Sequence, residues 1–190
     1  NPSEVIWSVE DGEFVQVDKE LLDRHPNARV VASPTTGLDH IDLEACGERG
    51  IKVISLQGET EFLENISSTS EHTIGLIIAL LRNYKAALNA PYKDREEYKG
   101  HTLSGKTLGI IGYGRLGQQV VSRAKAFEMN IFAVDKLEFD HPWRSSLDAL
   151  LGQSDVISLH IPLQGNEGFF TKAMFELMKP TAYFINTSRS

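Results

Sequence analysis

Strand-like and helix-like segments alternate through the second half of the chain, and this alternation constrains the fold more than any other feature. Short β-branched runs are separated from one another by helical patterns, at spacings that favour crossovers over hairpins. The expected strands are 107–111, 131–135, 156–161 and 183–186, and the expected helices are 115–128, 146–151 and 171–178. Strands joined through helices pair in parallel, so we predict an α/β fold with a Rossmann-type doubly wound parallel sheet.

The first half shows the same alternation in shorter elements. It contains expected strands at 4–9, 28–33 and 51–56 and expected helices at 18–25 and 42–50, the second capped by Asp42. Ser68-Thr69-Ser70-Glu71 fits a capping box, and the apolar stretch 73–81 behind it predicts a helix buried on most sides. The composition turns polar over 89–103. We therefore predict two α/β domains, 1–88 and 104–190, with a crossover linker at 89–103 between them.

Composition and charge exclude several classes of protein. Of the 190 residues 41% are hydrophobic, so the chain can bury a sizeable core, and its net charge of −7 argues against a surface for nucleic acid or an anionic membrane. Cys46 is the single cysteine, which rules out an internal disulfide and a thiolate metal cluster. No apolar run approaches eighteen residues, and the six histidines show no clustered partners. We expect a cytoplasmic protein without a metal site.

Gly112-Tyr113-Gly114-Arg115-Leu116-Gly117 fits the pattern G-x-G-x-x-G. It follows one expected strand and opens an amphipathic helix, and Asp135 ends the next expected strand. In this interpretation Gly112 permits the tight turn, Gly114 lets a diphosphate approach the backbone, and Gly117 lets the helix pack against the strand. Asp135 would bind ribose hydroxyls and repel the extra phosphate of NADP, which favours NAD. The alternative is three structural glycines in an ordinary loop.

Five segments in order resemble the D-isomer-specific 2-hydroxyacid dehydrogenases. The segment 103–117 is similar to the one that opens the cofactor domain of that family, which includes phosphoglycerate, glycerate and D-lactate dehydrogenases. The other four similar segments are 37–43 with 49–51, 70–73, 158–163, and 178–180 with 185–189. The resemblance implies a flavodoxin-like substrate domain beside the Rossmann-type NAD domain.

The resemblance also implies a reaction, in which a hydride passes between NAD and a D-2-hydroxy acid or its 2-oxo acid. Arg189 occupies the position of the catalytic arginine that holds the substrate carboxylate, and backbone groups near Thr36 and Gly37 would share that carboxylate. The residues expected at the cofactor are Gly112, Tyr113, Gly114, Arg115, Leu116, Gly117, Asp135, His160, Pro162, Thr187 and Ser188, the last four beside the nicotinamide ribose and amide. Members of the family often pair as homodimers.

The chain departs from the family pattern in its length and at individual sites. The family's acid–base pair, a glutamate and a histidine, comes after the position of Ser190, and we expect the chain to be a fragment at both ends that lacks this pair. Gln164 and Glu167 stand where the family commonly has threonines, and Ser190 replaces a glycine. The alternative function is a non-catalytic NAD-binding interaction protein, similar to a corepressor, on the same scaffold.

Overall fold

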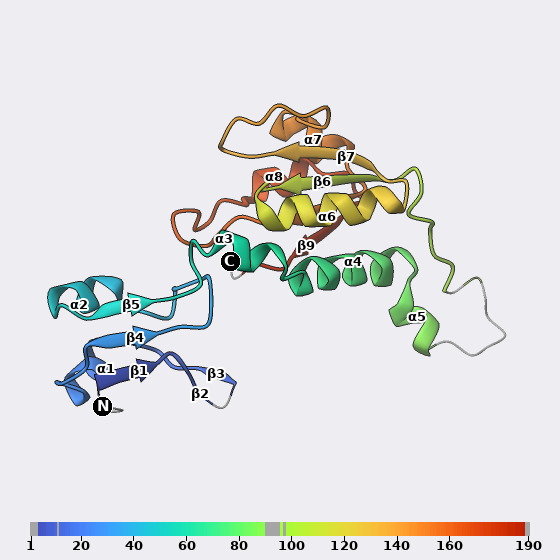
Figure 1. Ribbon diagram of the computed structural model, residues 1–190. Helices are drawn as coiled ribbons and strands as arrows, with labels where there is room; N and C mark the ends of the chain where they lie inside the picture. Colours follow the sequence, from blue (N-terminus) through green and yellow to red (C-terminus); the bar gives the residue numbers. More distant parts are fainter. Residues whose placement is uncertain (1–3, 11, 90–95, 97, 189–190) are drawn as a thin grey trace. The chain divides into compact units, whose positions relative to one another are not determined.

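The computed structural model describes residues 4–10, 12–89, 96 and 98–188 (Figure 1). The chain forms two compact units, Asn1–Asn65 and Ile66–Ser190. Among the described residues, no helix combines the length and the apolar character that crossing a lipid bilayer requires. Each unit is built around its own parallel sheet.

The first unit is a three-stranded parallel sheet in the order β1-β4-β5 with short helices. Its strands are β1 (Val5–Trp7), β4 (Val30–Ala32) and β5 (Lys52–Ile54), and its helices are α1 (Lys19–Arg24), α2 (Leu43–Glu48) and α3 (Thr60–Glu64). Asp18 and Asp42 cap α1 and α2 by accepting backbone N–H groups three residues ahead, at 2.8 and 2.9 Å. The predicted parallel pairing and the cap at Asp42 are confirmed.

A small hairpin in the first unit has no counterpart among the predicted elements. The expected strand 4–9 is divided, because β2 (Val9–Glu10) folds back on β3 (Glu13–Phe14) in an antiparallel hairpin. Gly12 lies in the hairpin turn with a φ of 85°. Strands of two residues are too short to show a hydrophobic period, so pattern alone could not have indicated them.

The second unit is a four-stranded parallel sheet in the order β7-β6-β8-β9. The strands are β6 (Thr107–Ile111), β7 (Asn130–Val134), β8 (Val156–Leu159) and β9 (Tyr183–Asn186). The helices are α4 (Ser68–Leu81), α5 (Tyr84–Asn89), α6 (Arg115–Ala126), α7 (Leu147–Gln153) and α8 (Lys172–Leu177). The doubly wound parallel sheet is therefore confirmed, and β6 and β9 have the bounds predicted from the sequence.

Helices cover both faces of this sheet. Buried side chains of α4 and α6 pack on one face in a core that includes Ile77, Val120 and Ile110. Leu150 and Leu151 of α7 pack on the other face with Ile157. The register pairs Ile111 with Val134 and with Leu159, so the carboxyl ends of the central strands meet at one edge. In an open α/β sheet this edge is where ligands bind.

Helix α4 belongs to the second unit, whereas the sequence pattern predicts the domain boundary after it, with a linker at 89–103. The units divide between Asn65 and Ile66, because the apolar side of α4, including Ile74 and Ile77, is buried in the core of the second sheet. Residues 90–95 and 97 of the expected linker lie outside the described residues. The expected capping box at Ser68–Glu71 does not form: Ser67 is the N-cap and makes no side-chain capping hydrogen bond, because its hydroxyl donates instead to the Glu71 carboxylate.

Candidate dinucleotide-binding site

The glycine-rich turn joins β6 to α6 at the carboxyl edge of the sheet. Gly112 has a φ of 95°, and a Cβ there would lie 2.7 Å from the His160 carbonyl oxygen. A Cβ at Gly117 would lie 2.1 Å from the Gly112 carbonyl oxygen. Both positions therefore exclude a side chain, the first for the turn and the second for the close approach of helix and strand.

Gly114 is the N-cap of α6, and a Cβ there would meet no protein atom within 4 Å. Its backbone is extended, with φ −75° and ψ −164°, so the protein itself would tolerate a side chain. As a glycine, Gly114 has no side chain with which to cap the helix. An ordinary loop has no need of this glycine, whereas an anion that approaches the helix end needs both the open space and the backbone donors. The geometry thus fits a dinucleotide diphosphate.

Asp135 follows β7 and faces the same turn. Its Oδ2 accepts the Tyr113 N–H at 2.7 Å, and its Oδ1 accepts the Leu137 N–H at 2.9 Å. Each carboxylate oxygen can accept a further hydrogen bond, so both can still receive ribose hydroxyls. The predicted proximity of Asp135 to the glycine-rich turn is therefore seen in the structure.

His160 follows β8 and is held at both its backbone and its ring. Its N–H donates to the Ile111 carbonyl at 2.7 Å, and its Nε2 lies 2.9 Å from the Ser158 hydroxyl. Burial of the ring lowers the pKa of His160 to about 4. The imidazole is therefore neutral at pH 7 and is poorly matched to proton transfer at that pH.

The ends of β8 and β9 carry the other expected nicotinamide contacts. The Thr187 hydroxyl lies 3.1 Å from the Thr73 hydroxyl of α4, and Ser188 donates from its N–H and its hydroxyl to Asn186 Oδ1. Pro162 is exposed, and its carbonyl accepts from Asn166. An open hollow of about 420 Å³ is lined by Ser68, Thr69, His72, Leu76, Asn186, Thr187 and Ser188. Sequence patterns provided no reason to expect α4 beside these residues.

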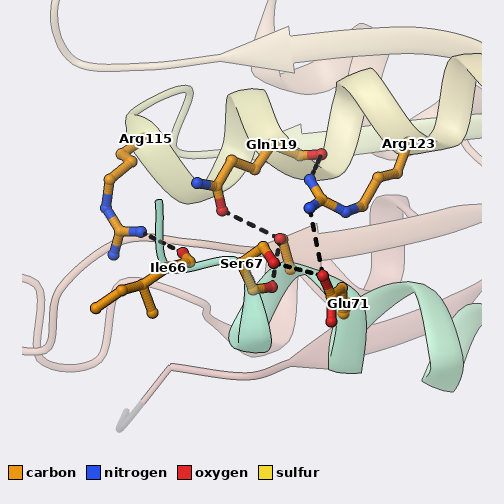
Figure 2. A network of polar contacts seen from close by, with 7 residues as sticks. Ile66, Ser67, Glu71, Arg115, Gln119 and Arg123 are labelled. Atoms are coloured by element: carbon orange, nitrogen blue, oxygen red, sulfur yellow. Dashed lines mark hydrogen bonds and ion pairs between the residues drawn. The ribbon is translucent and has the colours of Figure 1, made fainter. Parts of the chain in front are cut away.

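A polar row joins α4 to α6, as Figure 2 shows. Arg115 Nη1 donates to the Ile66 carbonyl at 3.0 Å, and Gln119 Oε1 accepts from the Ser70 hydroxyl at 3.1 Å. One turn further, Arg123 Nη2 lies 3.6 Å from Glu71 Oε1. The side chain of Arg115 is thus directed to the start of α4. Arg115, Gln119 and Arg123 are spaced four residues apart, which places them on one face of the helix. This spacing is the only feature of the three residues in the sequence that could have indicated a shared contact face.

The two expected substrate-binding positions of the first unit follow β4. Thr36 is exposed, and the Gly37 carbonyl accepts from the Thr35 hydroxyl at 2.8 Å. Arg189, the expected carboxylate-binding residue, lies outside the described residues. No group of three or more His, Cys, Asp or Glu side chains suited to a metal ion occurs in the part of the chain that the structure describes.

Comparison with known proteins gives consistent matches over most of the chain. Residues 74–190 match the D-isomer specific 2-hydroxyacid dehydrogenase, NAD binding domain. The chain is 34% identical over 184 residues to D-3-phosphoglycerate dehydrogenase of Archaeoglobus fulgidus, a match that covers 92% of this chain and 34% of that protein. It is 35% identical over 181 residues to hydroxypyruvate reductase of Thermotoga maritima, covering 92% of this chain and 58% of that protein.

A solved structure extends the similarity to the fold. NAD-dependent formate dehydrogenase from Staphylococcus aureus in complex with NAD superposes with a TM-score of 0.81 at 29% identity. The match covers 98% of this chain and 56% of that one. The chain thus spans between about a third and three fifths of the length of the proteins it matches.

Proposed function

Because the chain belongs to the D-isomer specific 2-hydroxyacid dehydrogenase family, we propose that it serves hydride transfer between NAD(H) and a D-2-hydroxy acid or its 2-oxo acid. The single observation that carries the proposal is the open space at Gly114, the N-cap of α6, beside the carboxylate of Asp135. The geometry of the turn explains why glycine is required at positions 112 and 117, but it does not explain the glycine at position 114.

The dinucleotide is held by backbone donors and by one carboxylate. N–H groups of the first turn, at Arg115, Leu116 and Gly117, bind the diphosphate, helped by the positive end of the helix dipole. Asp135 accepts from the adenosine ribose hydroxyls. A 2′-phosphate at about 4 Å from this carboxylate would be repelled by roughly 4 kcal/mol at an effective dielectric constant near 20, before screening, so NAD is preferred to NADP.

The nicotinamide supplies or accepts the hydride, and the ends of β8 and β9 orient it through His160, Pro162, Thr187 and Ser188. The neutral ring of His160 serves as a hydrogen-bonding group there. We therefore do not assign proton transfer to His160.

The substrate is held by its carboxylate. Arg189 would grip it with two charge-assisted hydrogen bonds, and backbone groups near Thr36 and Gly37 would share it. A small 2-oxo or 2-hydroxy acid meets this requirement, and the similar proteins named above include a phosphoglycerate dehydrogenase and a hydroxypyruvate reductase.

We also propose that the protein is a cytoplasmic homodimer. Apolar side chains at the end of α4 and on α5 support the dimer, because Leu80, Tyr84 and Leu88 are 38%, 50% and 84% exposed. Light scattering after size-exclusion chromatography measures the mass directly, and Leu88→Ser should shift it toward the monomer. A monomeric wild-type protein would contradict this part of the proposal.

Two assays test the proposed function. In calorimetry, NADH should bind more tightly than NADPH, and Asp135→Asn should narrow the difference. In the full-length protein, NADH oxidation by a panel of 2-oxo acids should depend on Arg189, so that Arg189→Lys lowers turnover and leaves NADH affinity nearly intact. Absence of NADH binding would refute the proposal. Tight NADH binding without turnover of any 2-oxo acid would favour the alternative, a cofactor-sensing interaction protein.

A further inference from the structure

Four aromatic rings surround the glycine-rich turn on the side of Asp135. The ring of Tyr113 stacks on Phe139, with centroids 4.6 Å apart, and its hydroxyl accepts a 2.9 Å hydrogen bond from Trp143 Nε1. His141 lies against Trp143, with centroids 3.5 Å apart. Tyr113, Phe139 and Trp143 pack on the main core of the second unit. The family pattern accounts for none of these contacts.

Hydrogen bonds connect the ring cluster to β7 and to Asp135. The Ala133 N–H of β7 donates to the Trp143 carbonyl at 2.8 Å, and the Ser145 N–H donates back to the Ala133 carbonyl at 3.0 Å. Trp143 is therefore fixed to the outer edge of β7, two residues before Asp135. Tyr113 is held at its hydroxyl by Trp143 and at its N–H by Asp135. The backbone N–H groups of Tyr113 and Leu137 hold the two oxygens of the Asp135 carboxylate, and the bond to Trp143 anchors the Tyr113 side chain on one side of that pair.

We propose that Tyr113 and Trp143 are positioning residues that set the preference for NAD over NADP by holding the Asp135 carboxylate in place. The inference rests on the proposed role of Asp135 at the adenosine ribose. Repulsion of a 2′-phosphate requires the carboxylate to stay near it, because a charge that can rotate away costs the phosphate little. Hydrogen bonds to the ribose hydroxyls require the same fixed position.

The charges around the ring cluster are mixed, and the Asp135 carboxylate gives the effect its sign. Lys125 Nζ lies 4.8 Å from the centroid of the Trp143 ring, and Arg144 pairs with Glu138 at 3.1 Å. Lys136 follows Asp135 directly in the chain. Arg144 is already paired with Glu138, so the sign comes from Asp135 itself: if the carboxylate moves away, its repulsion of the additional phosphate weakens. Loosening the ring cluster should therefore weaken NADH binding and strengthen NADPH binding relative to it.

Calorimetric titration of NADH and NADPH into wild-type protein, Tyr113→Phe, Trp143→Phe and the double variant tests the proposal. Each variant keeps an aromatic ring but loses the hydrogen bond between Tyr113 and Trp143. The ratio of the NADPH to the NADH dissociation constant should fall by about 3- to 10-fold in each single variant, the range expected for one hydrogen bond. The double variant should show about the same ratio as the singles, because the two residues act through one contact.

Matched controls separate positioning from general destabilisation. Arg144→Gln changes the same segment without touching either ring contact and should keep the wild-type ratio. A merely structural role would raise both dissociation constants by the same factor, so an unchanged ratio in Tyr113→Phe and Trp143→Phe overturns the inference. If Asp135→Asn collapses the ratio while those variants do not, only the positioning role fails. If the wild-type protein has no preference, the role of Asp135 fails with it.

Discussion

Gly114→Ser separates the stability of the helix end from its capacity to bind the dinucleotide. Serine is a better N-cap than glycine, and a Cβ at position 114 would meet no protein atom within 4 Å. The backbone there is extended and suits any residue. The variant should therefore fold and be more stable than the wild type by a few tenths of a kcal/mol.

The same substitution should weaken NADH binding strongly. The hydroxyl that it introduces would accept one of the first-turn N–H groups that the diphosphate requires, and the new Cβ would occupy the space through which the diphosphate approaches. A charge-assisted hydrogen bond contributes about 1.5 to 3 kcal/mol, so losing one raises the NADH dissociation constant by about 10- to 150-fold. Calorimetry gives the dissociation constant, and urea unfolding followed by circular dichroism gives the stability.

Two glycine substitutions in the same unit serve as comparisons. Gly75→Ala lies in α4, where a Cβ meets nothing within 4 Å, and should stabilise the helix by up to about 1 kcal/mol without changing NADH affinity. Gly117→Ala places a Cβ 2.1 Å from the Gly112 carbonyl oxygen and should lower both stability and affinity. If Gly114→Ser binds NADH as tightly as the wild type, the diphosphate does not lie against this end of α6.

Three further substitutions test other contacts. Arg115→Gln should lower the free energy of unfolding by about 1 kcal/mol in urea titrations, because the Ile66 carbonyl loses its donor; an unchanged midpoint would show that this bond adds nothing. Burial lowers the pKa of His160 from 6.5 to about 4, so the unfolded chain takes up a proton first and stability falls as the pH falls through this window. His160→Gln should remove up to roughly 3 kcal/mol of that pH dependence, and equal pH profiles for both proteins would contradict the shift. Burial acts to raise the pKa of Asp155, but the hydrogen bond from the Thr107 N–H and the charge of Lys179 outweigh burial, so the net effect lowers this pKa. The ionised carboxylate therefore stabilises the fold at neutral pH, and this stabilisation is lost as the pH falls through the pKa of the folded state. Asp155→Asn should cost about 1 to 2 kcal/mol at pH 7 and little in acid, and a cost independent of pH would exclude the ionised pair as its source.

Local sequence patterns were sufficient to predict most of the strands and helices of the second unit. The strands Thr107–Ile111 and Tyr183–Asn186 have the bounds that their β-branched and apolar runs predict. Helix α6 ends two residues earlier than the predicted 115–128, because Glu128 adopts a φ of 57°. When a residue other than glycine adopts a left-handed backbone conformation, the sequence does not reveal it. The hydrophobic period therefore predicted a helix that extends past its observed end.

Local sequence patterns predicted the order of strands and helices from β6 to β9, the glycine-rich turn and the acidic residue at the end of β7. These features depend on residues close together along the chain, where backbone conformation follows from hydrophobic period, β-branching and missing side chains.

Only the tertiary structure decides two other features. One is the unit to which α4 belongs, and the other is the set of contacts that hold the glycine-rich turn. An apolar stretch such as that of α4 can pack on either sheet. In the structure it is buried beside α6, and polar contacts of Arg115, Gln119 and Arg123 join the two segments there. The contact of Trp143 with Tyr113 joins residues thirty positions apart. Such pairs form because packing brings their side chains together, and a periodic pattern read along the chain contains no information about that meeting.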